Sequence, residues 1–262
     1  MKEPREIVYH DELNDEFSTA VIKARKIDEN YNYGSSSFFW RLAHFFVYRV
    51  IGIPVAWLYL KIVWRHKIVN KGVIKPYRKS AFFLYGNHTS TCFDPLVPAF
   101  VAFPKPAFVI VHPANVSIPF LGKLLPFAGA LPLPDTFGAT RNFMSVLKIR
   151  AEEKSCVAIY PEAHIWPYCI KIRNFSDASF AYPVKFGVPT FSFTNTYQKS
   201  RFLNRPKVVT YVDGPFFCDE SLGDKSLGRK EAVRQLRDKV HAKMTERSLM
   251  SNVEIIRYVK GN

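Results

Sequence analysis

The stretch AFFLYGNHTSTCFDP, residues 81–95, decides the fold. It begins with an apolar run over residues 81–86, typical of a buried strand, and continues into a polar turn. Similar apolar runs recur along the chain and alternate with helical segments. This alternation predicts an α/β fold with a mostly parallel central sheet flanked by helices. Ligands bind such sheets beyond the carboxyl ends of the strands, so the turn after Gly86 is a candidate site.

The other strand candidates are residues 67–74, 107–111, 129–133, 155–160, 190–194 and 208–213. Helices are expected over residues 95–102, 141–154 and 229–248. No internal repeat is visible, so we expect one domain over residues 67–262. A polar, partly ordered leader (1–37) and an apolar segment (38–66) precede it.

Residues 38–66 read FFWRLAHFFVYRVIGIPVAWLYLKIVWRH. The longest run without a charged residue is 50–60, eleven residues, whereas a spanning helix needs about 20. Pro54 is expected to divide the segment into two helices. Bases and aromatic rings flank the apolar faces, as in helices that lie in the membrane interface. We therefore expect an interfacial, monotopic helical hairpin, with a buried hairpin covering the domain as the alternative.

The charge of the chain is large and unevenly placed. The 262 residues are 48% hydrophobic, which excludes disordered and fibrous classes, and the net charge is +15. Such a charge indicates phosphates, a membrane surface or nucleic acid as partners. Residues 30–134 hold eleven bases and a single acid, Asp94. The base-poor leader and the lack of a recognition motif count against nucleic acid.

The four cysteines have no C-x-x-C spacing, so no metal site is expected. The N-terminal residues do not form a secretory signal, which indicates reduced cysteines and a cytoplasmic domain. Nucleotide-binding glycine loops, the G-x-S-x-G elbow and the H-E-x-x-H motif are absent from the sequence. No cofactor is therefore expected.

Two polar clusters carry candidate chemistry. In the first, Asp94 can orient the His88 ring so that its other nitrogen accepts a proton, or Asp94 can merely cap the helix that follows. In the second, Glu162 of YPEAHIW (160–166) can orient a substrate hydroxyl or a positive side chain, or cap a turn. Lys171 and Arg173 follow, either as phosphate ligands or as solvated loop charges. A third segment, GVPTFSFTN (187–195), indicates only a strand.

The order and spacing of these clusters resemble the 1-acylglycerol-3-phosphate acyltransferase family. The resemblance covers about residues 38–215: NHTS with Asp94 is similar to the first motif, residues 106–134 to the second, YPE to the third and VPT (188–190) to the fourth. Three departures stand out. Five residues rather than four separate His88 from Asp94, Ala163 to Ile165 replace the third motif's Gly-Thr-Arg, and no Arg ends the second motif.

The resemblance implies that His88, oriented by Asp94, deprotonates an acceptor hydroxyl that attacks an acyl thioester. The donor would be acyl-CoA or acyl-carrier protein, and the acceptor a lysophosphatidate-like lysophospholipid at a membrane surface, on its cytoplasmic face. With the motif Arg missing, Lys171, Arg173 and Arg141 are the candidates for binding the acceptor phosphate. Two alternatives stay open: another acceptor, such as glycerol-3-phosphate, and a catalytically silent lipid- or anion-binding homologue.

Overall fold

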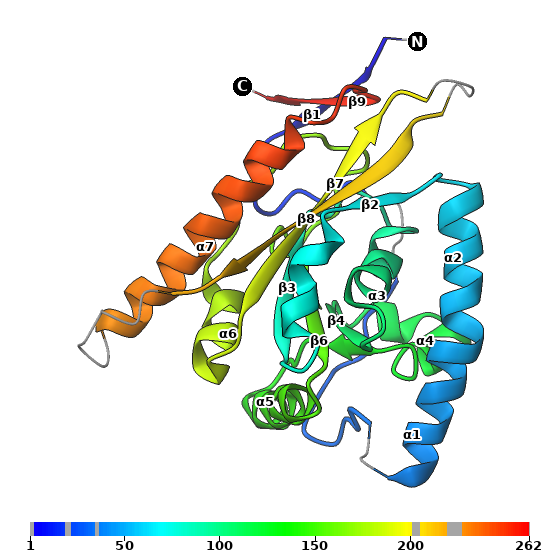
Figure 1. Ribbon diagram of the computed structural model, residues 1–262, viewed down its shortest axis with the longest axis vertical. Coiled ribbons are helices and arrows are strands. Elements are labelled where there is room, and N and C mark those ends of the chain that lie inside the picture. The colour runs from blue at the N-terminus through cyan, green and yellow to red at the C-terminus, as the bar shows by residue number, and fades with distance from the viewer. Residues whose placement is uncertain (1–2, 19–21, 35–36, 201–204, 219–226, 262) are drawn as a thin grey trace.

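A seven-stranded, mostly parallel sheet forms the centre of the protein, so the predicted α/β fold is confirmed (Figure 1). The computed structural model describes residues 3–18, 22–34, 37–200, 205–218 and 227–261. In the described part of the chain, the sheet has the strand order β2-β8-β7-β3-β6-β4-β5. Neighbouring strands are parallel except β7 and β8, which pair antiparallel.

The strands of this sheet are β2 (Lys67–Val69), β3 (Phe82–Gly86), β4 (Ala107–Val111), β5 (Ala130–Pro132), β6 (Cys156–Ile159), β7 (Thr190–Gln198) and β8 (Lys207–Phe216). The helices of the domain are α3 (Val97–Ala102), α4 (Leu121–Leu124), α5 (Phe137–Glu152), α6 (Ala181–Phe186) and α7 (Leu227–Ser248). Shorter 3-10 helices are η2 (Lys71–Tyr77), η3 (Asp94–Leu96), η4 (Asn115–Ser117) and η5 (Ala178–Phe180).

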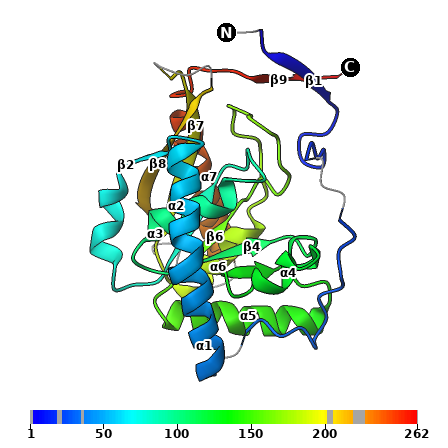
Figure 2. The same cartoon turned by 90° about the vertical axis from the view of Figure 1, so that its right-hand side faces the viewer.

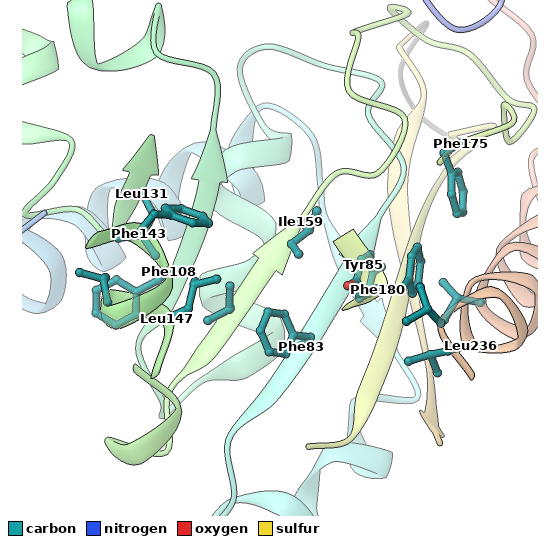
Figure 3. Packing of buried hydrophobic residues seen from close by; sticks show 14 of the residues in the cluster. Phe83, Tyr85, Phe108, Leu131, Phe143, Leu147, Ile159, Phe175, Phe180 and Leu236 are labelled. Carbon is teal, nitrogen blue, oxygen red and sulfur yellow. The ribbon is translucent and has the colours of Figure 1, made fainter. Parts of the chain in front are cut away.

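Strand β3 is buried on both faces of the sheet, because its side chains alternate between two hydrophobic cores. Phe83 and Tyr85 belong to a core that includes side chains of α5, α6 and α7, part of which Figure 3 shows. Phe82 and Leu84 belong to the opposite core, which also contains Leu60 and side chains of α3. This double burial fixes β3 and therefore the start of the polar turn that follows it.

One continuous helix spans Phe38–Ile62 (Figures 1 and 2), so the predicted hairpin is wrong. It consists of α1 (Phe38–His44), the π-helical η1 (Phe45–Gly52) and α2 (Ile53–Ile62). Pro54 does not break it, because Pro54 lies in the first turn of α2, directly after the π-helical segment. At this junction the Ile53 N–H donates to the Tyr48 carbonyl, five residues back instead of four. The wider turn accommodates the proline ring without a change of direction.

The helix contacts the domain at positions four residues apart. Trp40 and His44 lie against Phe127 and Phe108, and the Tyr48 hydroxyl accepts from the Ala107 N–H at 2.9 Å. The series continues with Ala56 and Leu60, both buried. Four residues turn an α-helix by about 400°, so this spacing would drift around the helix by about 40° per step. The wider π turns offset part of that drift and keep the contacts on one side.

The opposite side of this helix exposes large apolar side chains. Exposed fractions reach 80% for Phe39, 66% for Ile62 and 63% for Val55. By length and composition, the helix is apolar and long enough to cross a membrane. No other described residue covers this apolar face, and an exposed apolar face of this size is typical of a surface that contacts a partner or a membrane.

The described residues of the leader run along one side of the domain (Figure 2). Strand β1 (Arg5–Tyr9) pairs in parallel with β9 (Ile256–Lys260), a separate two-stranded sheet. Further along, Ile27 is fully buried in the core, and its N–H donates to Asp135 Oδ2 at 2.7 Å. The leader therefore packs against the domain at several points.

Candidate active site

Strand β3 ends at Gly86, a position where any side chain larger than hydrogen would clash. A Cβ on Gly86 would lie 2.0 Å from the ring of Phe193 on the neighbouring strand β7. The Phe193 ring occupies the space beside Gly86, and the next residues, Asn87 and His88, follow at the carboxyl end of β3 beside β7. This is the edge at which parallel α/β sheets bind ligands.

His88 and Asp94 form a hydrogen-bonded pair, despite the extra residue between them. His88 Nδ1 lies 2.9 Å from Asp94 Oδ2; the aspartate side chain is fully buried, and the histidine side chain is 14% exposed. A carboxylate only accepts hydrogen bonds, so Nδ1 carries the proton and donates it. Nε2 is then the basic nitrogen, and no hydrogen bond to another described residue occupies it. The pair has the arrangement of a histidine general base with an orienting carboxylate.

The surroundings of Asp94 show how the longer spacing fits. Oδ2 also accepts from the N–H groups of Thr89 at 2.6 Å and Ser90 at 2.8 Å. Oδ1 accepts from Asn195 Nδ2 at 3.1 Å. These donors lie outside the helix that follows, so Asp94 does not act as its N-cap. Both oxygens of a buried carboxylate are thereby satisfied.

The turn between the pair is closed by the hydroxyl of Ser90. Its Oγ accepts from the N–H groups of Cys92 and Phe93, at 3.2 and 3.3 Å. A serine side chain that bonds the backbone two and three residues ahead forms a compact local turn. The extra residue is therefore absorbed inside residues 89–93, and the Asp94 carboxylate still reaches His88.

Tyr160 covers the His88 ring. The two rings stack with their centroids 4.5 Å apart, and the Tyr160 hydroxyl donates to the Asp94 carbonyl oxygen. Burial raises the pKa of Tyr160 well above its usual value, so the phenol stays protonated. Tyr160 therefore restricts the orientation of both members of the pair.

Glu162 and Arg173 form a buried ion pair next to the backbone of His88. Glu162 Oε2 accepts from the His88 N–H at 2.9 Å and lies 3.3 Å from Arg173 Nη2, while Oε1 accepts from the Arg173 N–H at 3.0 Å. Both side chains are 2% exposed. The Arg173 guanidinium also lies over the Trp166 ring, 4.7 Å from its centroid. In this structure, Glu162 contacts the His88 backbone and the Arg173 side chain.

Removing the arginine should therefore destabilise the loop strongly. We expect Arg173→Ala to lower the free energy of unfolding by about 3–5 kcal/mol, because it leaves the Glu162 charge buried without its partner. Lys171→Ala removes an exposed side chain and should change it by less than about 0.5 kcal/mol. Urea unfolding of the two variants measures both. A loss of under about 1 kcal/mol for Arg173→Ala would contradict a structural role for the pair.

The other two predicted phosphate ligands are exposed to solvent. Lys171 is exposed in the loop between Glu162 and Arg173. Arg141 is exposed near the start of α5, and within the described residues no hydrogen bond or ion pair joins it to His88 or Glu162. Nor do the described residues contain a group of three or more His, Cys, Asp or Glu that could hold a metal ion.

The leader holds the loop that contains Glu162. Trp166 Nε1 donates to the Asp15 carbonyl at 2.7 Å, and the Ile165 N–H lies 3.1 Å from Glu16 Oε2. Phe17 packs edge-on against the Trp166 ring, with the centroids 5.2 Å apart. The acidic leader thus contacts the candidate site directly, which its sequence does not predict.

Comparison with solved structures finds a similar α/β fold in an acyltransferase. It is similar to the crystal structure of the 1-acyl-sn-glycerophosphate (LPA) acyltransferase PlsC from Thermotoga maritima, with a TM-score of 0.53 and 14% sequence identity. The match covers 82% of this chain and 95% of that chain. No family model matches, and no curated protein matches the sequence significantly. At this identity the likeness concerns the fold, and it agrees with the mostly parallel α/β fold predicted from the alternation of strands and helices.

Proposed function

We propose that the protein is an acyltransferase that transfers a fatty acyl group from a thioester to the hydroxyl of a lysophosphatidate-like acceptor. The observation that carries this proposal is the 2.9 Å contact between His88 Nδ1 and Asp94 Oδ2, at the carboxyl end of a central parallel strand. A complete, oriented base favours a catalyst over a silent lipid-binding homologue.

In this proposal, His88 Nε2 takes the proton of the acceptor hydroxyl as the oxygen attacks the thioester carbonyl. Asp94 stabilises the imidazolium that forms. When the tetrahedral intermediate collapses, the carbon–sulfur bond breaks and the imidazolium returns its proton to the departing thiolate. The products are an ester and a free thiol, and the pair ends in its starting protonation state. General base catalysis of this kind contributes about 10²–10⁴ in rate.

The surrounding charge suits phosphorylated substrates. Asp94 is the single acid among residues 30–134, and it is fully buried, so the bases of this region face no exposed carboxylate within it. Both acyl-CoA and acyl-carrier protein are anionic donors, and both remain candidates. Because Arg173 is occupied by Glu162, Lys171 is the more accessible ligand for the acceptor phosphate, with Arg141 as a further candidate.

The long N-terminal helix would lie on the membrane, on its cytoplasmic face. Its contacts with the domain run from Trp40 to Leu60, so one side is occupied by protein along most of its length. Beside it, α4 and the preceding residue expose Phe120, Leu121 and Leu124, and Phe127 just beyond α4 contacts the helix. An apolar face of this kind inserts into the headgroup and acyl boundary.

The proposal is tested with purified protein, vesicles that contain lysophosphatidate, and a labelled acyl thioester presented either on CoA or on acyl-carrier protein. We expect labelled phosphatidate to form with one of the two donors. Lys171→Ala should raise the acceptor KM about tenfold and leave the donor KM unchanged, because one charge-assisted contact is worth about 1.5 kcal/mol. Lys185→Ala, at an exposed base on α6, is the matched control. Transfer only to glycerol-3-phosphate or another lysophospholipid would replace the acceptor, and no transfer to any of these would refute the proposal.

A further inference from the structure

A chain of five hydrogen-bonded side chains runs from His66, shortly after the long N-terminal helix ends, to the candidate base His88. His66 Nε2 lies 2.7 Å from Thr210 Oγ1, and Thr210 Oγ1 donates to Asn195 Oδ1 at 2.6 Å. Asn195 Nδ2 donates to Asp94 Oδ1 at 3.1 Å, and His88 Nδ1 completes the chain at Asp94 Oδ2. The four members before His88 are buried, so water does not replace these contacts.

The donors and acceptors along this chain agree in direction. Burial lowers the pKa of His66 to about 4, so its ring is neutral at pH 7 and has one N–H. The single hydroxyl proton of Thr210 is given to Asn195, so Thr210 must accept from His66 Nε2. The Asn195 amide therefore has one orientation, because a flipped amide would set its oxygen against the Asp94 carboxylate.

The backbone of Asn195 is fixed as well. Asn87, which precedes His88, donates from Nδ2 to the Asn195 carbonyl at 3.0 Å and accepts from the Asn195 N–H at 2.8 Å. Asn195 thus bonds to both ends of the loop that carries His88 and Asp94. It also lies on strand β7, outside that loop.

We propose that Asn195 is a positioning residue for the His88–Asp94 pair, and that Thr210 fixes the amide of Asn195. The inference rests on the proposed function, since it concerns the same base. Oδ2 of Asp94 receives its backbone donors from the loop itself, at Thr89 and Ser90. Among the described residues, Oδ1 receives a donor only from Asn195, which ties the carboxylate to the sheet.

Asn195→Leu tests this role because leucine has a similar size and cannot donate. We expect kcat to fall about 10- to 100-fold, since a misplaced base loses rate steeply, while both KM values stay within about twofold. In nitrogen-15 NMR spectra of the full chain in detergent, the Nδ1–H signal of His88 should broaden or vanish in the variant. A purely structural role would lower stability without moving the His88 signal.

Thr210 supplies a second pair of variants that tests the same chain if Asn195→Leu does not fold. Thr210→Val removes the hydroxyl from a fully buried position with little change of shape, and Thr210→Ser restores it. We expect a several-fold loss of kcat in the first and recovery in the second. Thr196→Val is the matched control, because the buried Thr196 hydroxyl donates to the Val209 carbonyl and not toward Asp94.

The outcomes separate this inference from the proposed function. Loss of the His88 Nδ1–H signal in Asn195→Leu or Thr210→Val, with no acyl transfer even by the wild-type protein, would refute the function and keep the positioning role. Wild-type kcat and an unchanged His88 signal in both Asn195→Leu and Thr210→Val would overturn the inference. An effect of Thr196→Val equal to that of Thr210→Val would also overturn it.

Discussion

Asp94→Asn is expected to lower turnover by about three orders of magnitude while the protein stays folded. The amide must turn either its NH2 group or its oxygen toward His88 and the N–H groups of Thr89 and Ser90. With NH2 on that side, His88 can bond to it only by moving its own proton to Nε2, which removes the basic nitrogen from the substrate side. With the oxygen on that side, the amide is neutral and no longer stabilises an imidazolium.

The comparison for this experiment is His88→Ala, which should lose a similar factor of about 10²–10⁴. Asp213→Asn is the matched control: Asp213 is a buried carboxylate in the same sheet, paired with Arg247 at 2.7 Å, and has no part in the proposed chemistry. Circular dichroism and steady-state kinetics on the three variants provide the readout. Near wild-type turnover by folded Asp94→Asn would remove the main support for an active acyltransferase.

The second large effect concerns membrane binding. Replacing Phe39, Phe46 and Val55 together by Ser should weaken partitioning onto anionic vesicles by about three orders of magnitude. These side chains are 51–80% exposed in the protein, and each large apolar side chain contributes about 1.5–3 kcal/mol when it is buried. The fold should persist, since these side chains face away from the domain. Vesicle flotation measures the change.

The control is a triple serine variant at Phe217, Leu249 and Met250, which are also exposed and directly follow β8 or α7 in the chain, outside the long helix. It should float like the wild type. Equal losses in the two triple variants would mean that general surface apolarity, and not the helix, binds the vesicle. Labels at the two ends of the helix should report the same side of the bilayer; opposite sides would show that it crosses.

Much of the fold follows from local sequence patterns. Residues 107–111 form a strand as predicted, because an apolar run with β-branched residues suits a strand buried on both faces. The strand predicted over residues 67–74 stops at Val69, where Asn70 adopts a left-handed conformation and a 3-10 helix begins. The sequence does not predict the unbroken helix at Pro54, because proline breaks ordinary α-helical turns and a π-helical segment has no recognisable sequence pattern.

The sequence predicts those contacts of the candidate site whose residues lie in one short motif. His88 and Asp94 lie in one turn, so their pairing follows from sequence, whereas the burial of Arg173 depends on a loop fold that spacing does not specify. The sequence pattern around Asn195 indicates only a strand. An amide in the middle of a buried strand must find a buried partner, and this requirement is the signal that the sequence offers for Asn195.

The parallel pairing of β1 with β9 affects the order in which parts of the protein can fold during synthesis. Trp166 packs against both Tyr9 and Tyr258, at centroid distances of 4.8 and 4.7 Å, so its loop is held by residues near both extremes of the sequence. Synthesis proceeds from the N-terminus, and contacts between distant segments form slowly. On a ribosome, the segment with His88 and Asp94 would emerge well before strand β9 can pack against the loop behind it. The loop that contains Glu162 would therefore be the last part of the candidate site to become fixed.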